Sequence, residues 1–175
     1  MKRMAVALFA LGIAAPAFSQ SPHPQPSPGL PPLARSASLA GPRFGLTLLN
    51  ERLVERLNER NIKVNSMISQ FGWQFEKQFY VNNGGVAVLN EWVALVGGLD
   101  QGIALPSLSW MVGMRTANGT EFGVGPNLSA SGVALAIAAG TTLRAGFLNV
   151  PVNFAVVPSR SGMRISFLTG FSVRK

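Results

Sequence analysis

The chain contains no cysteine and a single histidine, His23. Disulfide bonds are therefore excluded, and the fold must be stabilised by packing and hydrogen bonds alone. Serine or cysteine nucleophiles need a neighbouring base, and no histidine is present beyond the proline-rich segment that holds His23. His23 has no second ligand nearby for a metal, so it is interpreted as a solvated linker residue. These absences favour a protein that is not an enzyme and that carries no cofactor or metal.

Charged residues are also scarce, at 13% of the chain. Residues 78–175 contain nine: Glu91, Asp100, Arg115, Glu121, Arg144, Arg160, Arg164, Arg174 and Lys175. Soluble domains usually carry about one charged residue in four, so this stretch is poorly suited to an ordinary water-exposed surface. The net charge of +8 comes from scattered basic residues. On an exported chain this favours acidic lipid or polysaccharide head groups over nucleic acid as a partner.

The first residues have the pattern of a secretory signal peptide. Lys2 and Arg3 give a positive start, residues 4–15 are almost all apolar, and Ala17-Phe18-Ser19 places small residues at a cleavage site. Residues 20–38 then hold six prolines among serine and glutamine, a composition typical of a disordered linker. The sequence therefore predicts a signal peptide over residues 1–19, a linker over 20–38 and one β domain over 39–175.

A long alternating stretch begins at Met67 and ends at Tyr80. Large side chains occupy its odd positions, namely Met67, Phe71, Trp73, Phe75 and Phe79, whereas glutamine, glutamate and glycine dominate the even positions. Successive side chains of an extended strand point to opposite faces, so this stretch predicts a strand with one aromatic and one polar face. At about 3.4 Å per residue it could cross a bilayer even when tilted.

Short apolar stretches separated by turn residues follow this strand, as in an antiparallel meander. The predicted strands cover residues 42–49, 66–80, 86–97, 103–117, 120–126, 132–143, 146–158 and 163–174. Residues 132–140 would also suit a short buried helix. Eight strands is the smallest common number that closes a barrel. The predicted fold is therefore all-β, a small closed barrel of about eight antiparallel strands.

Residues 50–60 predict one short amphipathic helix between the first two strands. Asn50 can cap it, and Leu53, Val54 and Leu57 form one apolar stripe. Two interpretations remain open: a plug or lid at one end of the sheet, or a connector packed on its edge.

The alternation divides the strands into two faces. The apolar face holds the candidate lipid- or ligand-facing residues Phe71, Trp73, Phe75, Trp92 and Trp110. The other face is small or polar and holds the candidate interior polar network: Gln70, Gln74, Glu76, Glu91, Arg115, Glu121 and Arg164. Three of these are carboxylates on separate strands, which are better explained as ion-paired interior residues than as an acid–base pair. Lys77 is the exception, because its charge falls on the apolar face.

In this architecture, though not in any specific motif, residues 42–175 resemble a small bacterial outer-membrane β-barrel. The resemblance implies an outer-membrane location, lipid contact, insertion by the barrel assembly machinery and a structural or narrow-pore role; homo-oligomers are possible. The alternative is a soluble periplasmic β-barrel or sandwich with the faces exchanged, which would hold a hydrophobic ligand or a protein partner against Phe71, Trp73, Phe75 and Trp110.

Overall fold

A computed structural model describes residues 38–160 and 162–173. The predicted signal peptide, and the predicted linker up to residue 37, lie outside the described residues. The elements in chain order are β1 (Gly41–Leu49), α2 (Glu51–Glu59), β2 (Met67–Val81), β3 (Ala87–Gly97), the 3-10 turn η1 (Leu99–Gln101), β4 (Leu105–Arg115), β5 (Thr120–Ser129), β6 (Gly132–Ala145), β7 (Leu148–Ser159), β8 (Gly162–Gly170) and β9 (Ser172–Val173).

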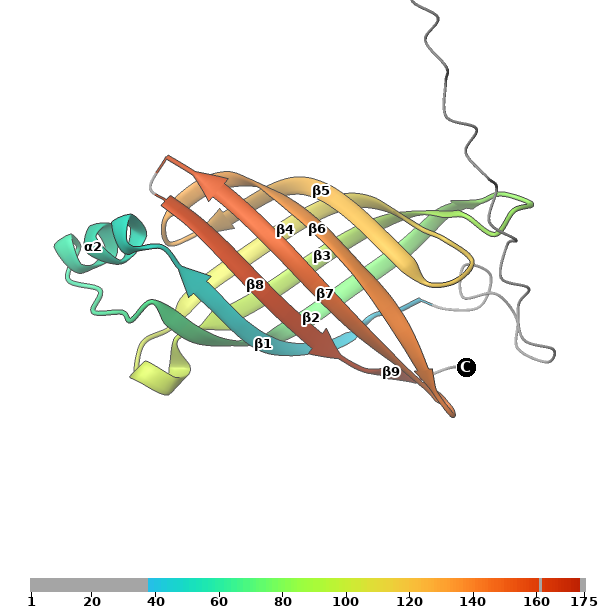
Figure 1. Ribbon diagram of the computed structural model, residues 1–175, viewed down its shortest axis with the longest axis horizontal. Helices are drawn as coiled ribbons and strands as arrows, with labels where there is room; N and C mark the ends of the chain where they lie inside the picture. Colours follow the sequence, from blue (N-terminus) through green and yellow to red (C-terminus); the bar gives the residue numbers. More distant parts are fainter. Residues whose placement is uncertain (1–37, 161, 174–175) are drawn as a thin grey trace, which may run out of the picture.

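The strands form one closed antiparallel barrel (Figure 1). Each of the eight long strands pairs with its sequence neighbours, and β1 also pairs with β8, as at Leu46 and Phe167. Two-residue β9 adds a short pairing to the start of β7. The predicted all-β closed barrel with one helix between the first two strands is confirmed. Residues 132–140 are strand and not helix, and β5 continues three residues beyond the predicted end at Pro126.

The two ends of the barrel differ. One end carries the chain termini of the described part and the hairpin turns between β2 and β3, β4 and β5, and β6 and β7 (Figure 1). The other end carries the long connection from Asn50 to Ser66, the η1 turn and two tight turns. We call these the hairpin end and the helix end.

At the helix end, α2 packs its apolar stripe against the barrel. Asn50 caps the helix, since its side chain accepts a hydrogen bond from the Leu53 N–H at 3.1 Å. Leu53 and Leu57 are buried in a cluster completed by Leu49, Val64 and Ile68. Leu53 and Leu57 also line a cavity of about 30 Å³ together with inward-facing strand residues. The helix therefore covers part of this end, as the lid interpretation requires.

Close approach of the strands explains the glycines of the inward face. A Cβ on Gly125 would lie 1.9 Å from the Trp110 carbonyl oxygen of the adjacent strand, which no real side chain tolerates. Gly72 is similarly placed against the Ala94 carbonyl. The alternation of β2 also breaks near its end, where the register shifts between Gln78 and Tyr80. Tyr80 occupies an even position, which strict alternation would turn inward, but beyond the register shift it is exposed.

Candidate functional site: the polar interior of the barrel

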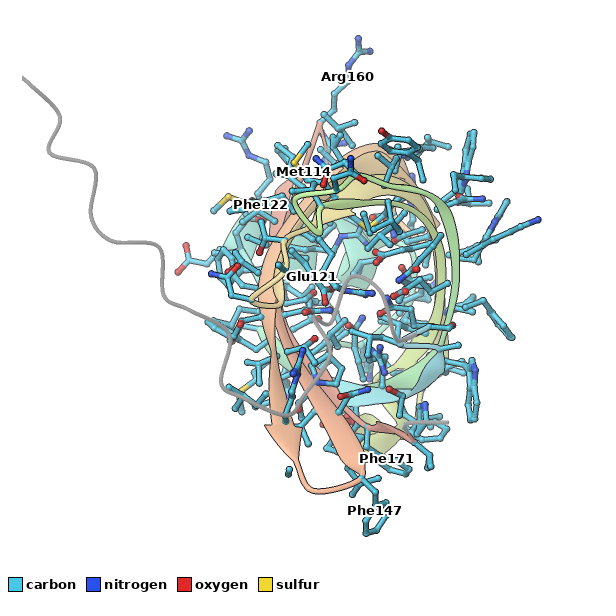
Figure 2. All side chains as sticks on the ribbon, turned by 90° about the vertical axis from the view of Figure 1, so that its right-hand side faces the viewer. Met114, Glu121, Phe122, Phe147, Arg160 and Phe171 are labelled. Atoms are coloured by element: carbon cyan, nitrogen blue, oxygen red, sulfur yellow. The ribbon has the colours of Figure 1, made fainter. Side chains whose placement is uncertain are left out.

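A buried ionic cluster lies inside the barrel toward the hairpin end. Arg115 bonds to both carboxylate oxygens of Glu76, with Nη1 at 2.9 Å from Oε1 and Nη2 on Oε2. Its Nε donates to Glu121 Oε1 at 2.7 Å, and the Thr142 hydroxyl donates to the same oxygen at 2.9 Å. Figure 2, a view toward the hairpin end, shows Glu121 inside the ring of strands. One guanidinium thus joins carboxylates from β2 and β5 across the interior.

A second arginine lies beside this cluster. The Arg43 Nε donates to Gln74 Oε1 at 3.0 Å, and its Nη2 donates to the Leu39 carbonyl at 2.6 Å. Arg43, Gln74 and Leu39 are all fully buried or nearly so. Ser38 also donates to the Glu76 carbonyl, at 3.3 Å. The segment before β1 is therefore held against the inside of the hairpin end.

Nearer the helix end, Arg164 organises a third polar group. Its Nη2 donates to Asn127 Oδ1 at 2.6 Å. The Asn127 amide nitrogen in turn donates to the hydroxyls of Ser107 and Ser109, at 2.8 and 2.9 Å. This chain of bonds fixes the side-chain orientation of Asn127 and connects β4, β5 and β8 through their inward faces.

A cavity of about 70 Å³ lies between these groups, and Glu91, Gln70, Gln74, Asn153 and Arg164 contribute to its lining. Four buried polar atoms of these residues have no hydrogen-bond partner, namely Gln70 Oε1, Gln74 Nε2, Asn153 Oδ1 and Arg164 Nε. Buried polar atoms are usually satisfied, and a cavity of this size has room for several water molecules. The middle of the barrel is thus suited to hold water or a very small polar solute.

The candidate residues of the polar face therefore all lie inside the barrel, but the structure does not join them into one network. Glu76, Arg115 and Glu121 meet directly, whereas Gln74 bonds to Arg43, Arg164 bonds to Asn127, and Glu91 and Gln70 line the cavity. Sequence reasoning missed Arg43, Asn127 and Thr142. Arg43 and Thr47 alternate with Phe44 and Leu46, so the alternation in β1 could have predicted that Arg43 points into the barrel.

The outer surface of the barrel is apolar. The five candidate lipid- or ligand-facing residues are exposed by 44–58%, namely Phe71, Trp73, Phe75, Trp92 and Trp110. In Figure 2 the labelled Met114, Phe122, Phe147 and Phe171 point away from the interior. Trp92 and Trp110 stack on neighbouring strands with ring centroids 5.8 Å apart. The soluble alternative needs its aromatic residues inside, and this arrangement is the opposite.

Charge is nearly absent from this outer surface. Among the strand residues that the structure describes, Lys77 is the only exposed charged side chain. The part of the chain that the structure describes contains no group of three or more histidine, aspartate or glutamate residues able to hold a metal ion. Nor do residues 38–160 and 162–173 include a helix that is both long and apolar enough to cross a membrane.

Neither a scan against profiles of known protein families nor a search of curated proteins found a match. A search of solved structures found a likeness to the backbone structure of the Yersinia pestis outer membrane protein Ail in a phospholipid bilayer nanodisc. The likeness covers 79% of this chain and 100% of Ail, with a TM-score of 0.49 and 13% sequence identity. In its closed eight-stranded architecture the chain resembles small outer-membrane β-barrels, as the sequence predicted.

Proposed function

We propose that the chain is a non-enzymatic outer-membrane β-barrel with a structural role, exported and inserted by the barrel assembly machinery. The observation that carries this proposal is the inverted distribution of side chains. Large apolar residues cover the outside of all eight long strands, whereas the strand arginines and glutamates named above point inward. A transmembrane barrel requires this arrangement, because its outer surface contacts lipid and its interior holds polar groups.

Strand length supports the same location. Six of the eight long strands have ten or more residues, and a tilted strand of about 9–11 residues crosses the apolar part of a bilayer. The shorter strands, β1 and β8, pair with each other and so share one sector of the wall. On a soluble barrel, an uncharged apolar surface that spans the length of the strands would be exposed to water and would cause the protein to aggregate.

The interior supports a structural role over an open channel. The Arg115 cluster crosses the lumen from β2 to β5, and Arg43 and Leu39 fill the space beside it. At the other end, α2 and its leucines cover part of the opening. Small barrels are in general just wide enough for side chains to fill, in contrast to large porins.

A narrow pore is the second candidate. The cavity of about 70 Å³ and its unpartnered polar atoms favour it, because they provide a hydrated section in mid-barrel. Water or ions would still have to pass the Arg115 cluster. The two candidates therefore differ in one measurable property, the conductance of the wild-type protein.

The asymmetry of the ends indicates an orientation. Outer-membrane barrels have short turns on the periplasmic side and longer loops outside. The longest connection, residues 50–66, is at the helix end, so we place the hairpin end in the periplasm and α2 at the cell surface. The exposed polar face of α2 would then be the main feature that the protein presents outside the cell.

The test combines insertion and conductance. The purified protein, added unfolded to phospholipid vesicles, should fold with heat-modifiable gel migration and resist extraction by carbonate. In planar bilayers it should show no steady conductance, whereas a narrow pore would give discrete openings. Recovery of the folded protein in the soluble periplasmic fraction, without detergent, would reject the membrane barrel altogether.

A further inference from the structure

Among the strand residues that the structure describes, Lys77 is the one exposed charge on the apolar outer face. It lies near the hairpin end of β2, and in the strand register it is directly opposite Asn90 of β3. Side chains at directly opposed positions have Cβ atoms about 4.5–5.5 Å apart, so the ammonium and the amide share one small patch. A lysine and an asparagine on a lipid-facing surface are costly unless they have a polar partner.

The orientation of the Asn90 amide is set by a neighbouring tryptophan. The Trp110 indole N–H donates to Asn90 Oδ1 at 2.6 Å. An indole nitrogen can only donate, so this bond requires the amide oxygen on the Trp110 side and leaves the Asn90 NH₂ as a donor. The patch therefore presents two kinds of donor, the Lys77 ammonium and the Asn90 NH₂, and its amide oxygen already accepts one hydrogen bond from Trp110. Such a pair is suited to an anion that accepts several hydrogen bonds.

The surroundings indicate where this anion would come from. Trp110 stacks on Trp92, and Phe75 is paired with Trp92 in the strand register, so aromatic rings border the patch on its side toward mid-barrel. Tyr80 and the hairpin turn lie on the other side. Tryptophan and tyrosine rings together with a lysine whose head reaches outward are typical of the interface between acyl chains and head groups. A phosphate group at this boundary between acyl chains and head groups belongs to a membrane lipid.

We propose that Lys77 and Asn90 form a binding site for the phosphate of an anionic phospholipid in the leaflet at the hairpin end. Lys77 supplies the charge, Asn90 supplies a directed donor that Trp110 holds in place, and the aromatic rings contact the acyl chains. This inference depends on the proposed membrane location, and it adds a lipid preference that a purely structural barrel does not need.

The experiment is native mass spectrometry of the full-length protein released from micelles that contain equal amounts of phosphatidylglycerol and phosphatidylcholine. We expect the wild type to retain one phosphatidylglycerol with a preference of about fivefold, the value for one lysine near an anionic surface. Lys77→Gln should abolish the preference. Asn90→Asp keeps the acceptor for Trp110 but replaces the NH₂ by a carboxylate that pairs with Lys77, so it should also abolish retention.

Arg160→Gln is the matched control, since it removes an exposed arginine at the helix end. It should leave the preference unchanged. Equal retention of both lipids by the wild type, or equal loss in Lys77→Gln and Arg160→Gln, would overturn the proposed site. Displacement of the lipid by inorganic phosphate would overturn the assignment to a lipid. Heat-modifiable migration checks folding of each variant, and if Asn90→Asp fails to fold, Lys77→Gln still decides the question. A wild type that does not insert into vesicles refutes the proposed function, whereas an inserted wild type without lipid preference refutes this site alone.

Discussion

Replacement of Arg115 by leucine tests whether the interior cluster holds the barrel together. Arg115 is fully buried, and the side chains of Glu76 and Glu121 are 0% and 9% exposed, so solvent screens these ion pairs little. The substitution leaves two carboxylates without their cation, and Glu91 lies directly opposite Glu76 in the strand register. Removal of one partner from a buried ion pair costs about 3–5 kcal/mol. We expect a loss of this size in the free energy of unfolding.

The assay is reversible unfolding by guanidinium chloride in phospholipid vesicles, followed by the fluorescence of the outward-facing tryptophans. Arg160→Leu serves as the control and should change stability by less than about 0.5 kcal/mol, because Arg160 is exposed at a turn. The triple variant Arg115→Leu, Glu76→Leu, Glu121→Leu separates lost attraction from uncompensated charge. Apolar replacement of a whole buried cluster is often neutral, so most of the stability should return.

Two results would refute this reasoning. A single Arg115→Leu variant as stable as Arg160→Leu would mean that water or ions replace the guanidinium without cost. A triple variant less stable than the single one would mean that uncompensated carboxylates are not the cause of the loss.

The remaining predictions concern the wall and the helix end. Trp73→Arg should cost about 2–4 kcal/mol if Trp73 lies near the membrane midplane, and impair vesicle insertion, whereas Trp73→Phe should insert normally. Gly125→Ala should reduce the folded fraction on heat-modifiable gels, because the new Cβ would clash with the Trp110 carbonyl oxygen. Gly102→Asn is the control and should fold normally, since a Cβ at Gly102 has no atom within 4 Å and its φ of +70° is one that asparagine tolerates. Hydrogen bonds from the Ser69 side chain and backbone lower the pKa of the Asp100 carboxyl. These hydrogen bonds stabilise the fold fully above the ordinary aspartate pKa, and their effect is lost as the pH falls through the lowered pKa of Asp100. In that pH range, hydrogen exchange of the Ser69 amide should become faster in the wild type but not in Asp100→Asn.

The sequence was sufficient to predict the fold because parity is a local property. Phe71, Trp73 and Phe75 alternate with Gln70, Gln74 and Glu76 on one strand, and no information from other strands is needed to separate the two faces. The alternation of side chains alone does not indicate which face of the sheet points outward. The scarcity of charge after residue 78 favoured lipid on the outside, and the exposed aromatic side chains of the structure agree with that choice.

The contacts of the interior could not be predicted from parity. Arg115 meets Glu121 because the β4–β5 register places them opposite each other, but it reaches Glu76 across β3, which depends on the curvature of the closed wall. Asn127 was missed because the strand was predicted to end at Pro126. Proline in a strand interrupts the ladder of hydrogen bonds, yet β5 continues past it with Pro126 exposed on the outer face. The outward position of Tyr80 does not follow from the alternation, because the register shift between Gln78 and Tyr80 leaves no signal in the residues before it.

The distribution of polar contacts along the barrel axis argues for a function at its ends. The hairpin half is fixed by Arg115, Arg43 and the segment before β1, which together leave little freedom in the lumen. Toward the helix end, the Arg164 group bonds the strand walls to one another, whereas the connecting segments are held by an apolar cluster around Leu53 and by the exposed bonds of the η1 turn. Local opening is cheapest where contacts are few and backbone bonds are exposed, so motion should concentrate at the connection from Asn50 to Ser66. In the proposed orientation, a rigid wall that carries one adaptable helix outside the cell is better suited to presenting that helix than to conducting solutes.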